Sequence, residues 1–384
     1  MQATIIWQNP ELAVKRPGEN GTVFGAMDAL FKRQPFGVDF IVGYTSPQGL
    51  GLIREPIKAH VERGNFFRLI TGFDYGRGKD KVKAELETLQ SGFGDNFALS
   101  FFEHPENRGN TFHPKLYAFH FKNEVIILCG SSNLTEGGLS QNHELMVSLK
   151  LNPSRQQDAV HLKEFEQILQ FYSGNTYTFG QSSLFNWQNP NIEAEALFRV
   201  MESLFKANPV KVDFIVGNAS HTGLEMIREL IFAHIDNGGK LNIITAFDYS
   251  SKRDQDERKL RDIQTSFPNK VEVRIFEHKL IDDSEKKSIF HPKAYVFHYP
   301  AEVVLFCGSS NLTKGGFSDN HEAMVQLNLN PKDMDNARQL RILERMFDYY
   351  SRSSRPISQN GENHRGHGNG GRFRRQTNGT RFKY

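Results

Sequence analysis

The feature that most constrains this chain is an internal duplication. The stretch FHPKLYAFHFKNEVIILCGSSNLTEGGLSQNHE, residues 112–144, returns as FHPKAYVFHYPAEVVLFCGSSNLTKGGFSDNHE, residues 290–322. The two copies are 178 residues apart and align without an insertion or a deletion. Chance does not produce such agreement, so two copies of one structural unit are expected within the 384 residues.

The duplication extends over most of the chain. WQNP at residue 7 returns at 187, VDFIVG at 38 returns at 212, and ITGFDY at 70 returns as ITAFDY at 244. VDFIVG and ITGFDY return at an offset of 174, so a loop before the second FHP is four residues longer than its counterpart. We therefore predict one domain over residues 1–178 and a second over 179–352, with a polar linker near 173–186.

The predicted elements of the first copy alternate between helices and apolar strands. Helices are expected at residues 24–33, 50–63, 79–90 and 156–172, and strands at 38–43, 66–72, 97–103, 113–121, 125–130 and 143–151. Such alternation favours the α/β class, here two tandem α/β/α sandwich domains around mixed sheets.

The remaining residues, 353–384, form a separate compositional class. This segment holds seven Lys and Arg against one Glu, within a chain whose formal net charge is +3. It has almost no aliphatic side chains, so it cannot bury enough surface to fold alone. We predict a disordered basic Gly/Arg-rich tail that contacts phosphates and bases without regard to sequence.

Two cysteines, Cys129 and Cys307, occupy equivalent places in apolar runs. Buried free thiols fit a reducing compartment. The first residues lack a basic segment followed by a long apolar one, so no signal peptide is predicted. No apolar run approaches the roughly 18 residues that span a bilayer. We therefore expect a cytoplasmic protein.

Chemically active residue types recur at fixed spacing in both copies. In the first copy, His113 and Lys115 are two apart on a strand and therefore lie on one face. A Gly-Ser-Ser-Asn turn and then a glutamate follow, which adds hydrogen-bond donors and a carboxylate able to set an imidazole tautomer. The predicted catalytic residues are His113, Lys115, Asn133, Glu144, His291, Lys293, Asn311 and Glu322, and the predicted substrate-binding residues are Ser131, Ser132, Ser309 and Ser310.

This doubled H-x-K…GSSN…E constellation resembles the phospholipase D superfamily, most closely its nuclease branch, which includes metal-independent type II restriction endonucleases. The resemblance implies two phospholipase D-like domains related by a pseudo-two-fold axis and sharing one active site. It also implies that one histidine attacks phosphorus, while the other protonates the leaving oxygen and then activates water. By analogy His113 is the nucleophile and His291 the acid. The lysines and asparagines would hold the phosphoryl oxygens, so no metal or other cofactor is expected.

The sequence departs from the fuller family motif H-x-K-x4-D at one position. His120 and His298 stand where the aspartate is expected, on the opposite strand face from the catalytic histidines. A structural role is expected for both. The loss of the aspartate argues against the lipid-hydrolysing members and favours the nuclease branch.

Other polar residues are weaker candidates. His104, His120, His278 and His298 lack the tight spacing of a zinc site. Asp74 and Asp248 end strands where α/β sheets place ligands, but a turn or capping role is equally expected.

The leading hypothesis is a metal-independent phosphodiesterase, an endonuclease acting on DNA rather than RNA. No folded sequence-reading module is expected beyond the two halves, so a partner protein would supply any specificity. A restriction or defence role rests on analogy alone. Internal pairing makes a monomer sufficient. The alternatives are a phospholipase D-type phosphatidyl hydrolase or transferase, and a nucleic-acid-binding module without turnover.

Overall fold

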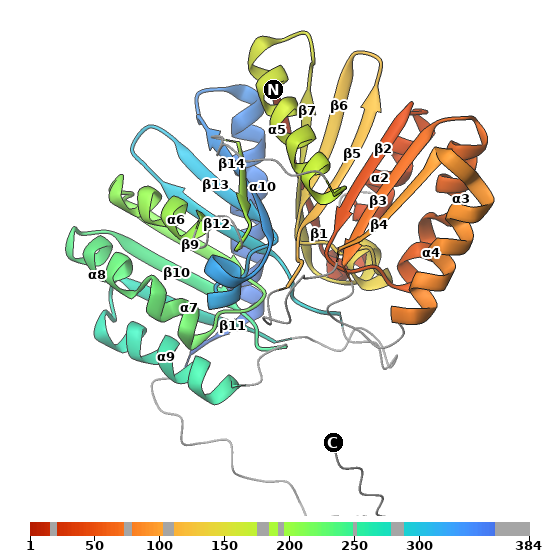
Figure 1. The fold of residues 1–384 in the computed structure, drawn as a ribbon. Helices are drawn as coiled ribbons and strands as arrows, with labels where there is room; N and C mark the ends of the chain where they lie inside the picture. The colour runs from red at the N-terminus through yellow and green to blue at the C-terminus, as the bar shows by residue number, and fades with distance from the viewer. Residues whose placement is uncertain are drawn as a thin grey trace, which may run out of the picture.

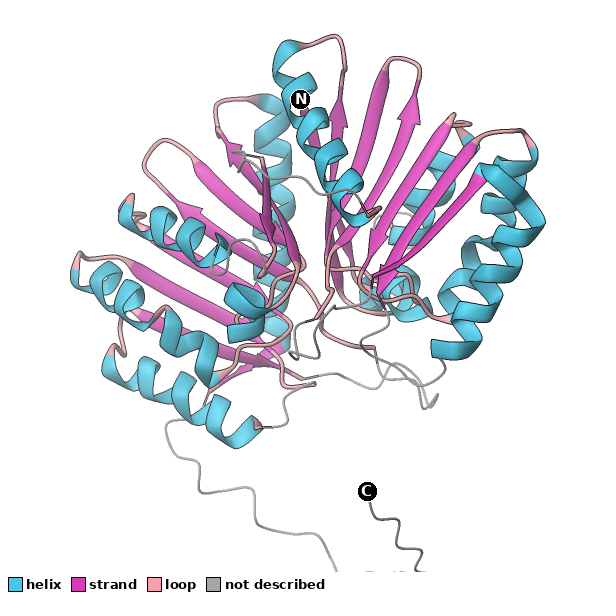
Figure 2. Ribbon diagram, in the orientation of Figure 1, coloured by secondary structure: helices cyan, strands magenta, loops and turns pink. Residues whose placement is uncertain are grey.

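Each half of the chain folds around one β-sheet, and the two sheets face each other (Figure 1). The computed structural model describes residues 1–15, 21–72, 79–102, 111–174, 184–190, 196–248, 252–277 and 288–357. Both sheets are mixed and carry helices, which confirms the predicted α/β class (Figure 2).

The elements of the first half follow the predicted order. They are β1 (Gln2–Gln8), α1 (Pro10–Lys15), α2 (Val23–Lys32), β2 (Gly37–Val42), α3 (Pro47–Glu62), β3 (Phe66–Gly72), α4 (Lys79–Phe93), the 3-10 turn η1 (Gly94–Asn96), β4 (Phe97–Phe102), β5 (Lys115–Phe121), β6 (Glu124–Gly130), the π-helical turn η2 (Gly137–Gln141), β7 (Glu144–Leu151) and α5 (Gln156–Tyr172).

The second half repeats this order with small changes. Its elements are β8 (Phe185–Gln188), α6 (Ala196–Lys206), β9 (Lys211–Val216), α7 (His221–Met226), α8 (Arg228–Asp236), β10 (Lys240–Thr245), α9 (Arg253–Ser266), β11 (Val271–Phe276), β12 (Lys293–His298), β13 (Val303–Gly308), the π-helical turn η3 (Gly315–Asp319), β14 (Glu322–Leu329), α10 (Met334–Ser353) and β15 (Ser354–Pro356).

The two sheets have matching topologies. The first has the order β1-β7-β6-β5-β2-β3-β4 and the second β15-β11-β10-β9-β12-β13-β14-β8. In each, three neighbouring strands are parallel, β2-β3-β4 and β9-β10-β11, and the other pairs are antiparallel. Lys115 pairs with Val42 and Lys293 with Val216, so both H-x-K segments lie at the carboxyl ends of parallel strands.

The outer face of each sheet packs on its own helices. Helices α2, α3 and α4 supply apolar side chains to one outer core, and helices α6 to α9 supply them to the other. Several of these helices begin at a serine or threonine that accepts a backbone hydrogen bond, as Ser46 does from Gly49 at 3.1 Å and Ser220 does from Gly223 at 3.1 Å. Such caps satisfy backbone donors that the helix leaves unpaired.

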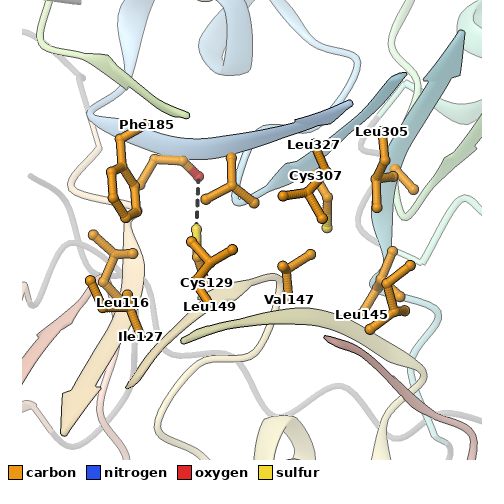
Figure 3. Close-up of a cluster of buried hydrophobic side chains, with 14 of the residues drawn as sticks. Leu116, Ile127, Cys129, Leu145, Val147, Leu149, Phe185, Leu305, Cys307 and Leu327 are labelled. Atoms are coloured by element: carbon orange, nitrogen blue, oxygen red, sulfur yellow. Dashed lines mark hydrogen bonds between the residues drawn. The ribbon is translucent and has the colours of Figure 1, made fainter. Parts of the chain in front are cut away.

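The inner faces of the two sheets form a single apolar core. Strand β6 lies against β14, and β7 against β13. Figure 3 shows side chains of both sheets meeting there, with Cys129 on one side and Cys307 on the other. Helices α5 and α10 complete this core through Phe165, Leu343 and other apolar side chains. Because apolar burial is the main stabilising contribution to folding, the two halves fold against each other rather than independently.

Two buried Trp–Tyr–His groups join helices α10 and α5 to the opposite half of the chain. Trp7 donates to the Tyr350 hydroxyl at 2.9 Å, and that hydroxyl is 3.1 Å from Nδ1 of His143. The second group repeats this arrangement with Trp187, Tyr172 and His321, at 2.8 and 2.7 Å. Each tyrosine therefore comes from one half and its histidine from the other.

Three structural features differ from the sequence expectation or lie outside what it covered. Strands β1 and β8 were not predicted; each pairs at the edge of its sheet with the strand that begins at the motif glutamate. Ser354–Pro356 form β15 on β11, so the folded part extends beyond the predicted boundary at 352. Residues 358–384 of the predicted tail lie outside the described residues. Within the described ranges, none of the helices is both long and apolar enough to cross a bilayer.

Candidate active site

The two H-x-K segments enter the site through close backbone contacts. Gly43 donates to the Pro114 carbonyl at 2.6 Å, and Gly217 donates to the Pro292 carbonyl at 2.7 Å. A Cβ atom at Gly43 would lie 2.7 Å from the Cα of His113. Only glycine permits this approach, which explains the glycine that ends both VDFIVG strands.

Backbone hydrogen bonds then connect each H-x-K segment to the opposite half. The amide of His113 donates to the carbonyl of His321 at 3.0 Å, and His321 donates back to Thr111 at 2.8 Å. The equivalent bonds join His291 and His143 at 3.0 Å, and His143 and Ile289 at 2.9 Å. The two catalytic segments therefore meet at one place, as the resemblance implied.

The imidazole of each H-x-K segment is held by the carboxylate of the other half. Nδ1 of His113 lies 3.1 and 3.0 Å from the two oxygens of Glu322. Nδ1 of His291 lies 3.1 Å from both oxygens of Glu144. A carboxylate binds Nδ1–H, which leaves the Nε2 lone pair for nucleophilic or base chemistry.

The two motif lysines are fully buried behind the histidines. Nζ of Lys115 donates to the His113 carbonyl at 2.6 Å, and Nζ of Lys293 donates to the His291 carbonyl at 2.7 Å. Burial lowers the pKa of Lys293 to about 7, although Glu144 and Glu322 oppose the shift. Burial also holds the pKa of Lys115 well below its usual range. A lysine amine whose pKa is lowered in this way gains a proton when an anion binds beside it.

The surroundings of both H-x-K imidazoles favour their neutral form. Burial lowers the pKa of His113 to about 4, against the opposing effect of Glu322. Burial and the neighbouring Lys293 lower the pKa of His291. A neutral imidazole is the form required of a nucleophile or general base.

The serines of the two GSSN turns are engaged inside the protein. The hydroxyl of Ser131 donates to Glu144 and that of Ser309 donates to Glu322. Ser132 bonds to the Asn133 carbonyl at 3.3 Å, and Ser310 bonds to the Gly316 carbonyl at 2.8 Å. All four are buried, so their hydroxyls support the carboxylates and the turns. Contact of these serines with a substrate stays a prediction.

Asn133 and Asn311 have a different environment. Each is half-buried, and its Oδ1 atom is buried without a hydrogen-bond partner in the described part of the chain. Native proteins rarely leave a buried amide oxygen unsatisfied. A phosphoryl oxygen is itself an acceptor and would bind the Nδ2–H group rather than Oδ1, so the predicted role of these side chains stays a prediction.

Sequence reasoning missed a second pair of asparagines. Asn142 accepts from the Ile289 amide at 3.2 Å and donates to Glu144 at 3.4 Å. Asn320 makes the same contacts with Thr111 at 3.2 Å and Glu322 at 3.3 Å. Both asparagines stand two residues before the motif glutamate of their copy. This repetition was the sequence signal that could have identified them.

The histidines that replace the motif aspartate lie away from the site. Nε2 of His120 contacts Asp39 at 2.7 Å, and Nε2 of His298 contacts Asp213 at 2.7 Å. His120 pairs with Gly37, at the opposite end of β2 from Val42. These contacts fit the expected structural role.

The remaining candidates do not form a metal site within the described residues. No group of three or more His, Cys, Asp or Glu side chains that could hold a metal occurs there. Asp248 accepts a hydrogen bond from the Phe290 amide at 3.2 Å and so supports the chain just before His291. Asp74, His104 and His278 lie outside the described residues.

Known proteins share this fold. Residues 200–343 match a family model described as cardiolipin synthase, PLD-like domain. Phosphatidylserine synthase from Haemophilus influenzae is similar with a TM-score of 0.62 at 13% identity, over 92% of this chain and 87% of that one. A variant of yeast tyrosyl-DNA phosphodiesterase gives 0.53 at 11% identity, over 87% and 91%.

Polyphosphate kinase from Porphyromonas gingivalis gives a TM-score of 0.58 at 12% identity, over 90% of this chain. The chain spans about half of the length of that protein, 47%. A search of curated protein sequences finds no significant match. The chain shares the fold of these proteins, and residues 200–343 of its second half match the PLD-like domain model.

Proposed function

We propose that this protein is a metal-independent phosphodiesterase that hydrolyses DNA in the cytoplasm through a covalent phosphohistidine. The observation that carries the proposal is the reciprocal arrangement in which Glu322 holds His113 and Glu144 holds His291. This pairing binds both imidazoles through Nδ1 at one site, which supports a mechanism in which each takes a different part.

In the first step, Nε2 of His113 attacks phosphorus and the bond from phosphorus to the leaving oxygen breaks. His291, protonated when the anionic substrate is bound, donates its proton to that oxygen. Neutral His291 then takes a proton from water, whose oxygen attacks phosphorus and breaks the phosphorus–nitrogen bond. Lys115 and Lys293 offset the charge on the phosphoryl oxygens, so the protein itself supplies the positive charge.

DNA is favoured over a lipid substrate by two sequence features. The basic segment after residue 357 suits contact with phosphates and bases, and the motif aspartate is replaced by His120 and His298. One observation favours a second candidate, phosphatidyl hydrolysis or transfer: the fold is similar to that of a phosphatidylserine synthase over 92% of the chain. A nucleic-acid-binding module without turnover is the third candidate.

The test is cleavage of labelled single- and double-stranded DNA and RNA in excess EDTA. Wild type is compared with His113→Ala and His291→Ala, and with His298→Gln as a matched histidine control outside the site. We expect EDTA-resistant DNA cleavage by wild type and by the control, and none by the two site variants. Cleavage abolished by EDTA contradicts the covalent histidine mechanism. Turnover of a phosphatidyl lipid with intact nucleic acids supports the second candidate. DNA binding by wild type without any cleavage, unchanged in His113→Ala, supports the third.

A further inference from the structure

The two halves differ in chemistry at one matched position beside the GSSN turns. In the second half, Nδ1 of His221 lies 2.7 Å from Asp256, which also accepts the His221 amide at 2.7 Å. Asp256 is 2% exposed, whereas His221 is half-buried. At the offset of 174 residues, the equivalents in the first half are Pro47 and Val82. A His–Asp pair with a buried carboxylate therefore exists in the second half and is replaced by apolar residues in the first.

His221 begins helix α7, which packs closely on the residues after Asn311. The Ser220 amide donates to the Leu312 carbonyl at 2.9 Å, and a Cβ atom at Gly223 would lie 2.4 Å from that carbonyl oxygen. The first half has the same backbone arrangement, with a Cβ at Gly49 reaching within 2.2 Å of the Leu134 carbonyl. The two positions are therefore equivalent in space, and only their side chains differ.

The residue after the following threonine also differs between the halves. Lys314 in the second half corresponds to Glu136 in the first. The Lys314 side chain is 60% exposed and lies 3.0 Å from Asp319, an ion pair that water screens. Helix α7 packs against η3, the turn that begins next to Lys314. Next to its GSSN turn, the second half thus has the imidazole of His221 and the ammonium of Lys314. The first half has Pro47 and the carboxylate of Glu136 at these positions.

The contact with Asp256 decides what His221 can bind. Because the carboxylate holds Nδ1, Nε2 is the ring atom left for a ligand, and it has no partner within the described ranges. A protonated imidazole backed by a buried carboxylate donates Nε2–H to an anionic oxygen. The ammonium of Lys314 adds attraction for an anionic ligand. A phosphate group satisfies both donors.

We propose that His221 and Lys314 form a subsite for the phosphate adjacent to the scissile one, on the second-half side only. This inference rests on the proposed function. A nucleic acid strand has direction, whereas the paired catalytic motifs are nearly symmetric. A one-sided phosphate subsite gives the bound strand one polarity and thereby assigns each ester oxygen of the scissile phosphate to one histidine. Asp256 acts as a positioning residue for His221.

The experiment compares three substrates, the dinucleoside phosphate TpT and its forms with one added terminal phosphate, pTpT and TpTp. We expect wild type to show a KM about tenfold lower for one of the two phosphorylated forms than for TpT, corresponding to about 1.4 kcal/mol for one charged contact. His221→Gln and Lys314→Gln should each reduce that ratio toward one. Asp256→Asn should reduce it less. Glu136→Gln, at the matched position of the first half, should leave the ratio as in wild type.

Thermal denaturation of each variant shows whether it is folded, and the ratio of KM values within one variant does not depend on its active fraction. Wild-type ratios near one for both phosphorylated forms contradict the subsite, as do ratios that persist in His221→Gln and Lys314→Gln. Equal ratios for pTpT and TpTp contradict the polarity. A wild-type protein that cleaves no nucleotide substrate contradicts the proposed function itself, and the subsite with it.

Discussion

Glu322, from the second half of the chain, lies 3.0 Å from Nδ1 of His113, from the first half. The reverse pair, Glu144 and His291, is 3.1 Å apart. Neither imidazole is oriented by its own repeat. A single repeat therefore lacks a complete catalytic group, and the site forms only where the two sheets pack together.

Removing one carboxylate should damage the histidine of the other half. We expect Glu322→Gln to lower kcat by about 100-fold or more, because an amide neither fixes the tautomer of His113 nor offsets charge on it. The measurement is turnover of a 4-nitrophenyl phosphodiester. In the variant combining Glu322→Gln with His113→Ala, the loss should equal that of His113→Ala alone. Additive losses would contradict the cross-repeat pairing.

Replacement of each histidine should block a different step of the reaction. In His291→Gln, a good leaving group still departs without protonation, but no base remains to activate water. We expect a burst of about one equivalent of 4-nitrophenol and an acid-labile phosphoryl group on His113. His113→Gln should show no burst. The opposite pattern would exchange the two roles while keeping the mechanism.

Binding of sulfate should weaken as pH rises. The pKa of Lys293 is about 7 in the ligand-free site, and a bound dianion raises it. The bound state then holds more protons than the free state above pH about 7, so affinity falls by up to about tenfold per pH unit. Calorimetry in buffers of different ionisation enthalpy measures the proton uptake. Lys293→Met should show less uptake, and a pH-independent affinity in wild type would contradict this charge assignment.

His298 should contribute to stability without taking part in turnover. Its contact with the buried Asp213 carboxylate is 2.7 Å long, and Lys211 and Asn242 also bind that carboxylate, at 2.7 and 2.6 Å. Because those two contacts remain, we expect His298→Gln to lower the free energy of unfolding by only about 1 kcal/mol. Urea denaturation measures this change. A large loss of turnover in a folded variant would show that the residue reaches the site.

The cysteines should report whether the two halves separate. Cys129 and Cys307 are both fully buried in the shared core, and burial raises the pKa of Cys307 to about 12. The thiolate is the reactive form, so maleimide labelling of the native protein should be slow. Both thiols should react once urea opens the core. Fast labelling under native conditions would contradict a tightly packed interface.

Several features could be predicted from the sequence because they depend on local pattern. The strands that carry VDFIVG and VIILCG, the helix at 156–172 and the α/β class follow from periodicity and turn residues. Strand β1 escaped prediction because Gln2–Gln8 is stabilised by pairing with β7, which is distant in sequence. The boundary before β15 was missed for the same reason.

The sequence by itself determined that two equivalent copies exist and which polar residue types each one carries. Only the tertiary structure decided that each glutamate serves the histidine of the other copy. It also decided that Ser131 and Ser309 support those carboxylates, and that Trp7 and Trp187 each bond a tyrosine beneath a histidine. The physical reason is that spacing along a chain defines which side chains share a strand face. The partner of a side chain across an interface depends on how two apolar surfaces pack, which no local pattern encodes.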